Sequence, residues 1–145
     1  MIQLYVNCWA VLIAAIANMA LGFAWYGPLF GKQWVAMMGW TKAEMEKGRE
    51  KMQKDGWKTY LLAFAGSLMT SFVLAYVITF LGAYFYIGGI AMGMVTGFWM
   101  WVGFVVPVTL STVLWEGKSW KLWFLNTSYY MFAFMIMGAI VSLWP

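Results

Sequence analysis

Four long apolar stretches alternate with polar segments along the chain. The apolar stretches cover about residues 4–25, 60–81, 87–110 and 122–143, and none of them contains Asp, Glu, Lys or Arg. Each is close to the roughly 20 residues that an α-helix needs to cross a bilayer core of about 30 Å. The pattern therefore predicts an all-α, polytopic membrane protein in which residues 1–145 form a single domain of four transmembrane helices.

The longest polar segment, residues 31–58, lies between the first and second apolar stretches. Thr41 and Glu44 have the spacing of a capping box, in which the threonine caps a helix and the glutamate bonds back to the cap. We therefore expect an amphipathic or solvated helix over about residues 42–54. Gly56 is where we expect this helix to end.

The end of the first apolar stretch carries Trp25 and Tyr26, followed by Gly27 and Pro28. Tryptophan and tyrosine rings are enriched in the headgroup layer, where one edge of the ring is wet, so this pair is predicted to be interfacial. Proline lacks the backbone N–H that the next helical turn needs. The Gly-Pro pair is therefore expected to stop the first membrane helix.

Small residues recur every fourth position in three of the four stretches. Gly89, Gly93 and Gly97 form two overlapping G-x-x-x-G units, a pattern that lets membrane helices approach closely. The first two stretches carry similar stripes, made of Ala10, Ala14, Asn18 and Gly22, and of Ser67, Ser71, Ala75 and Thr79. Three such stripes exceed what one compact bundle needs. They favour a helix-packing subunit that self-associates or belongs to a larger membrane complex.

Several polar side chains fall within the apolar stretches, namely Asn7, Asn18, Ser67, Ser71 and Asn126. Asn7 and Asn18 are eleven residues apart, about three turns of helix, which places them on one face. A buried asparagine is costly unless it is hydrogen-bonded. These residues either bridge neighbouring helices or line a polar path. The second interpretation gives an alternative function, a passive channel or facilitator for a small neutral or polar solute.

The charged side chains all lie in two loops, and basic residues outnumber acidic ones by 9 to 5. The positive-inside rule makes both loops cytoplasmic, so both chain termini are predicted to lie outside, and we expect the bacterial inner (plasma) membrane. Anionic lipid headgroups then provide the counter-charge, and no nucleic-acid partner is expected. No ionisable side chain lies within the apolar stretches, which argues against a proton- or ion-driven pump.

Candidate catalytic chemistry is sparse. The chain has no histidine and one cysteine, Cys8, which lies in apolar surroundings with no basic residue nearby in the sequence. We therefore predict no catalytic residue, no metal site and no cofactor, and we do not expect an enzyme. The predicted partners are the lipid bilayer and either copies of the chain or another membrane protein.

A third interpretation is an interfacial binder. Here Trp25 would meet Trp115 and Glu116 near the charged side of the membrane. Glu116 has an alternative role, because it can pair with Lys118 or Lys121 in the same loop, and exposed ion pairs of this kind contribute little.

The chain also resembles the small membrane proteins grouped as domain of unknown function 1761. The residues that carry the resemblance are Asn7, Gly22, the run Trp25-Tyr26-Gly27-Pro28-Leu29-Phe30-Gly31-Lys32-Gln33-Trp34, the later run Trp115-Glu116-Gly117-Lys118, Asn126 and Tyr129. The resemblance covers nearly the whole chain. It implies a four-helix membrane fold and no particular activity.

Overall fold

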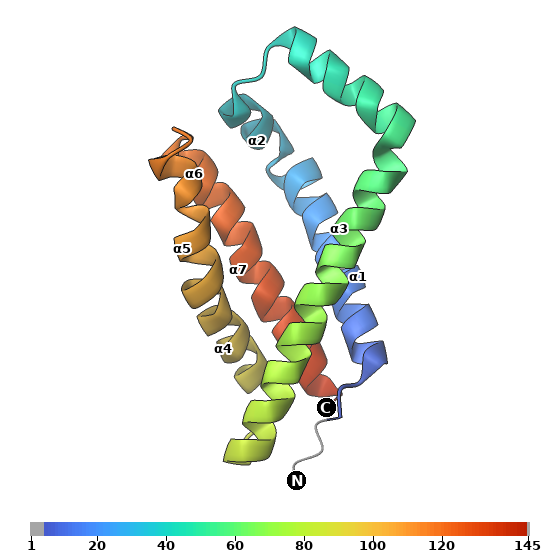
Figure 1. Ribbon diagram of the computed structural model, residues 1–145, viewed down its shortest axis with the longest axis vertical. Coiled ribbons are helices and arrows are strands. Elements are labelled where there is room, and N and C mark those ends of the chain that lie inside the picture. Colours follow the sequence, from blue (N-terminus) through green and yellow to red (C-terminus); the bar gives the residue numbers. More distant parts are fainter. Residues whose placement is uncertain (1–4, 145) are drawn as a thin grey trace.

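The computed structural model describes residues 5–144, and this part of the chain is helical with short connections (Figure 1). The elements, of which η1 and η2 are π-helical turns, are α1 (Cys8–Ala24), η1 (Trp25–Leu29), α2 (Gly31–Met38), α3 (Lys42–Phe85), α4 (Ile90–Met100), η2 (Trp101–Val105), α5 (Val106–Thr109), α6 (Ser111–Leu114) and α7 (Trp120–Leu143).

Within residues 5–144, four helical runs are long and apolar enough to cross a membrane, namely Cys8–Leu29, Lys42–Phe85, Ile90–Leu114 and Trp120–Leu143. The connection from α2 to α3 and the turn from α6 to α7 lie at one end of the bundle (Figure 1). The start of α1 and the end of α7 lie at the other end. Both charged loops therefore occupy the same end, which we call the loop end.

The first membrane helix ends at Leu29, directly after Gly27 and Pro28, which confirms the expected stop. Its last turn is the π turn η1, in which the backbone N–H of Phe30 donates to the carbonyl of Trp25 at 2.9 Å. Because Pro28 has no N–H to bond the carbonyl four residues earlier, the α-helical pattern gives way to a wider turn here, and Phe30, with a φ of −124°, lies outside the helix. The α-helical pattern resumes at Gly31 and ends before Gly39, whose φ of +65° suits glycine.

The expected helix end near Gly56 is wrong, because α3 runs without interruption from Lys42 to Phe85, a length of 44 residues. One glycine costs a helix only about 1 kcal/mol relative to alanine, which is too little to terminate it. In Figure 1 the helix changes direction between its polar first part and its apolar remainder, so that the first part projects from the bundle. We call this first part, residues 42–58, the arm.

The capping box predicted at the start of the arm is present. The Thr41 N–H donates to a Glu44 carboxylate oxygen at 2.7 Å, and the Glu44 N–H donates to the Thr41 hydroxyl at 3.3 Å. Two of the helix's otherwise unpaired first donors are thereby satisfied.

Thr41→Ala is expected to fray the arm without unfolding the bundle. Loss of a capping side chain costs about 1 kcal/mol, and this cap contacts only the first turn. Hydrogen exchange should become several-fold faster over residues 42–46 and stay unchanged over residues 60–81. Gln53→Ala, in the middle of the same arm, is the control and should alter neither segment.

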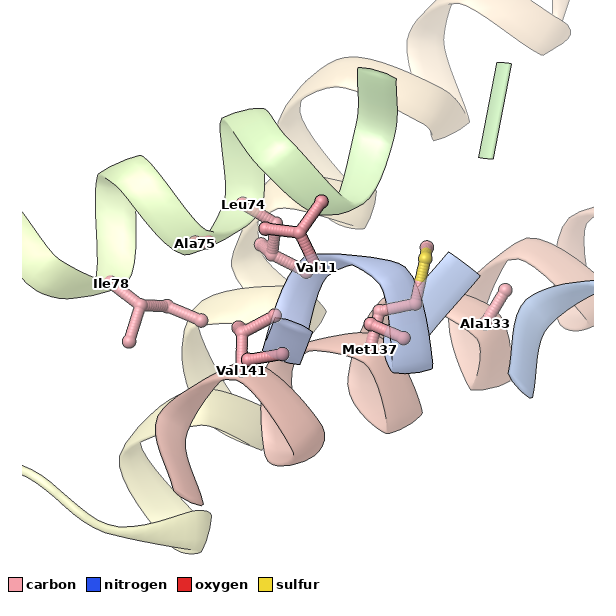
Figure 2. Close-up of a cluster of buried hydrophobic side chains, with 9 residues drawn as sticks. Val11, Leu74, Ala75, Ile78, Ala133, Met137 and Val141 are labelled. Carbon is pink, nitrogen blue, oxygen red and sulfur yellow. The ribbon is translucent and has the colours of Figure 1, made fainter. Parts of the chain in front are cut away.

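The core lies in the half of the bundle away from the loop end, where α1, α3 and α7 meet (Figure 2). Alanines allow these three helices to close tightly, since Ala10, Ala14 and Ala133 are almost fully buried. The other members of the buried cluster are Val11, Leu74, Ala75, Ile78, Met137 and Val141. The Ser71 hydroxyl donates to the Val11 carbonyl at 3.0 Å and links α3 to α1 within the core. This half of the interior is therefore packed and apolar.

The glycine stripe of α4 faces α7. A Cβ added at Gly93 would collide with the carbonyl oxygen of Gly138, and one added at Gly97 would collide with that of Phe134. Gly89 does not take part, because it lies just before α4 with a φ of +92° and no heavy atom of another element near its Cβ position. The predicted packing face therefore consists of Gly93 and Gly97, and it is used within one chain.

Candidate functional site

Some of the polar residues predicted inside the membrane form hydrogen bonds within their own helix, and others form hydrogen bonds to a neighbouring helix. Asn7 lies just before α1 as its N-cap, and its side-chain oxygen accepts from the N–H groups of Trp9 at 3.0 Å and Ala10 at 3.4 Å. Both of these hydrogen bonds lie within the first turn of α1, so they bridge no neighbouring helix. Asn7 satisfies the first turn of its own helix.

Asn18 links three helices. Its side-chain nitrogen donates to the Ser67 hydroxyl of α3 at 2.7 Å, and the Tyr129 hydroxyl of α7 donates to its side-chain oxygen at 2.9 Å. Gly22, one turn further along α1, makes room for the tyrosine, because a Cβ there would lie 3.1 Å from the Tyr129 hydroxyl oxygen. The small-residue stripe of α1 therefore serves this contact as well as the core.

A second polar bridge lies closer to the loop end. The Tyr26 hydroxyl of η1 donates to the side-chain oxygen of Asn126 in α7 at 3.0 Å. The rings of Tyr26 and Tyr129 are adjacent, with centroids 5.2 Å apart. The two bridges thus lie next to each other and hold α1 and η1 against α7.

The four residues predicted to be interfacial occupy different environments. Trp25 is only 9% exposed and packs on Phe30, whose ring centroid is 4.6 Å away, whereas Trp115 is 85% exposed. The prediction that Trp25 lies half wet and meets Trp115 is therefore wrong. Trp25 is buried because it lies on the inner face of its turn. The residue type alone does not predict on which face of the turn it lies.

A cavity of about 560 Å³ opens beside the second bridge, and we call it the loop-side cavity. Its wall combines amide, hydroxyl, carboxylate and ammonium groups with aromatic rings. It is lined by Tyr26, Trp34, Met38, Thr109, Thr112, Glu116, Lys118, Leu122, Trp123, Asn126, Thr127 and Tyr130. Of the predicted site residues, Tyr26, Asn126 and Glu116 meet here.

Thr127 is the most buried polar side chain of this cavity. It is only 2% exposed, and its hydroxyl has no hydrogen-bond partner among the described residues. Its backbone carbonyl is occupied, since it accepts from the Trp101 indole N–H at 2.9 Å. A buried hydroxyl without a partner costs about 1–3 kcal/mol, which a group that bonded it would recover.

A second hollow of about 680 Å³, which we call the lateral cleft, lies between α1 and α3. Its wall is mostly apolar and includes Asn18 and Tyr129, which form the first polar bridge. The other residues of the wall are Ile16, Met19, Ala20, Gly22, Phe23, Tyr26, Gly27, Thr59, Tyr60 and Ala63. Tyr26 lines both the cleft and the loop-side cavity.

Several residues of the site were not predicted from the sequence, above all Thr127, Tyr129 and Tyr130. A signal for them exists in the run Asn126-Thr127-Ser128-Tyr129-Tyr130, which is an unusually polar start for an apolar helix.

Glu116 is the one acidic residue in the wall of the loop-side cavity. In residues 5–144 no three His, Cys, Asp or Glu side chains gather as a metal site would require.

The fold defines an all-helical protein with four helices long and apolar enough to cross a membrane, which is consistent with a membrane location. The chain belongs to the family described as Protein of unknown function (DUF1761), whose sequence model matches residues 9–142. The resemblance noted in the sequence is thereby confirmed over nearly the whole chain, with Asn7 outside the matched range. Comparison with curated proteins and with solved structures found no match.

Proposed function

We propose that this protein is a membrane-embedded binding protein that takes the polar part of a small molecule into the loop-side cavity. The unpartnered, buried hydroxyl of Thr127 carries the proposal. Asn126 and Thr112 also line the wall, and each already has one hydrogen bond within the protein, since the Asn126 oxygen accepts from Tyr26 and the Thr112 hydroxyl donates to the Thr109 carbonyl. Few polar groups placed in a largely apolar wall are typical of ligand sites, and the volume lies within their range of about 300–1,000 Å³.

The charged residues in the wall favour a ligand that carries both signs of charge. Glu116 provides a carboxylate and Lys118 an ammonium group, both exposed to solvent. The rings of Trp34, Trp123 and Tyr130 also line the cavity, and aromatic faces attract cations. A zwitterion with an ammonium and a phosphate group fits this combination.

The channel alternative gains less support from the geometry. A path to the far side would have to continue past Asn18 and Tyr129 into the buried cluster around Ala14, Leu74 and Met137. Binding from one end needs no such path. The solute uptake of vesicles containing the protein, compared with that of vesicles containing Asn18→Leu, separates the two functions, because a binding protein transports nothing in either form.

Self-association and membership in a larger complex also gain less support, because the small-residue stripes that suggested them pack within the chain. Lipid covers the exposed apolar faces in our proposal. The proposed role is binding without catalysis, since the cavity wall contains neither histidine nor cysteine. With the charged loops on the cytoplasmic side, as predicted, the cavity opens toward the cytoplasm.

The binding test uses the single cysteine of the chain. In a Cys8→Ser background, Met38→Cys places a reporter thiol in the cavity wall, and its rate of modification by a small methanethiosulfonate reagent reports occupancy. Phosphoethanolamine is expected to slow this modification in a saturable way. Ala133→Cys, in the buried core, is the control for non-specific reagent entry and should stay unmodified.

Thr127→Val keeps the shape of the side chain and removes its hydroxyl. It is expected to weaken protection by phosphoethanolamine by about tenfold, which corresponds to about 1.4 kcal/mol. Ser128→Ala, at the neighbouring position outside the cavity wall, should leave protection unchanged. An unmodified Met38→Cys thiol, or full modification at every phosphoethanolamine concentration, would contradict the proposed site.

A further inference from the structure

The lateral cleft is more apolar than a site for a free polar solute requires. The α1 side consists mainly of Ile16, Met19 and Phe23, and the α3 side includes Tyr60 and Ala63. Several of these side chains are exposed on the surface of helices long and apolar enough to cross a membrane. The cleft therefore faces the region that lipid chains occupy, whereas the loop-side cavity carries the charged residues.

Tyr26 is shared by these two spaces. It lines both of them, and its hydroxyl donates to the side-chain oxygen of Asn126, another residue of the loop-side cavity. Tyr26 belongs to the π turn η1, and turns of this kind occur frequently at functional sites. A molecule with one polar and one apolar end can therefore place the two ends on either side of this ring.

We propose that the ligand of this protein is a single-chain amphiphile. Its zwitterionic head occupies the loop-side cavity, and its one apolar chain passes Tyr26 into the lateral cleft. This inference rests on the proposed function, since the head site is the loop-side cavity. The two volumes, about 560 and 680 Å³, are each the size of a small-ligand site, and the charged residues Glu116 and Lys118 line only the first of them.

Entry from the membrane follows from this arrangement. The chain of an amphiphile already lies among lipid chains, so moving it into an apolar cleft requires no transfer through water. The cleft therefore selects the ligand by the shape of its chain, and the loop-side cavity recognises its polar head. A substitution that fills the cleft should weaken the binding of only those ligands that have a chain.

The test compares lysophosphatidylethanolamine with phosphoethanolamine, which is its polar head without the chain. Protein carrying the Met38→Cys reporter and Cys8→Ser is placed in phosphatidylcholine nanodiscs, and protection of the thiol is measured with both probes. Ala63→Phe adds a ring to the cleft wall at an exposed position. Leu62→Phe is its matched control, one residue away on the same helix and outside the cleft wall.

The expected result is that Ala63→Phe weakens protection by lysophosphatidylethanolamine about tenfold. Protection by phosphoethanolamine should stay as it is, and Leu62→Phe should alter neither. If Ala63→Phe changes protection by neither probe, or by both equally, the amphiphile is wrong and the polar site of the proposed function stands. If neither probe protects the thiol in the unsubstituted cavity, both proposals are overturned.

Discussion

Replacing Gly93 with leucine is expected to separate α4 from α7 and to lower the stability of the protein by about 3 kcal/mol or more. The side chain would begin within the backbone of α7, at the carbonyl of Gly138, with the Ser142 hydroxyl beside it. A flexible side chain can move aside, but a helix backbone cannot do so without displacing the whole helix. Overpacking of a tight interior typically costs about 1–3 kcal/mol, and a clash with backbone belongs at or above the upper end of that range.

The measurement is the midpoint of thermal unfolding in detergent, recorded together with the mass of the protein in the same detergent. Gly103→Leu is the control, because Gly103 lies in η2 with no atom of another element near its Cβ position. We expect Gly93→Leu to lower the midpoint by about 10 °C or to abolish folding, while Gly103→Leu leaves it nearly unchanged. A lower mass with an unchanged midpoint would instead place this glycine face between two chains.

The sequence predicts those features of the fold that depend on local physics. Hydrophobic length locates the four long helices, and the spacing of Thr41 and Glu44 locates the start of α3. The spacing of Gly93 and Gly97 indicates a close helix contact but not its partner. That partner is α7 because Gly138 provides a matching flat surface, and only the folded chain brings the two glycines together.

The errors in the predicted fold have a common physical origin. Gly56 weakens a helix by an amount that the surrounding structure can offset, so α3 continues through it, whereas the first membrane helix does end directly after Pro28. Likewise, tryptophan is a residue type typical of the membrane interface, but Trp25 is buried because its side chain points into the protein. Propensities describe the residue, whereas these outcomes depend on its neighbours.

The candidate site is predictable only in part for a related reason. Asn18 and Asn126 are conspicuous as amides within apolar sequence, and both form cross-helix hydrogen bonds. Their tyrosine partners, Tyr129 and Tyr26, lie about 100 residues away in the sequence, so no local pattern shows that they meet these amides. Thr127 is conspicuous only once its burial and its lack of a partner are known.

Asn18→Leu is the second substitution with a large expected effect, since it removes both hydrogen bonds that join α1 to α3 and α7 near the lateral cleft. The Ser67 hydroxyl, 5% exposed, and the Tyr129 hydroxyl then lose this partner. Leaving buried polar groups unpaired costs about 1–3 kcal/mol, more than the bonds themselves contribute in a membrane, where the measured average is about 0.6 kcal/mol. The thermal midpoint should therefore fall by several degrees.

A triple variant separates unpaired groups from lost packing. Asn18→Leu combined with Ser67→Ala and Tyr129→Phe removes every member of the bridge, so no group is left without its partner. Its midpoint should lie above that of Asn18→Leu alone, because the desolvation penalty disappears with the polar groups. Thr70→Val is the control, since the Thr70 hydroxyl bonds the Gly66 carbonyl of its own helix. A triple variant less stable than the single one would mean that Tyr129 and Ser67 stabilise the bundle through contacts other than this bridge.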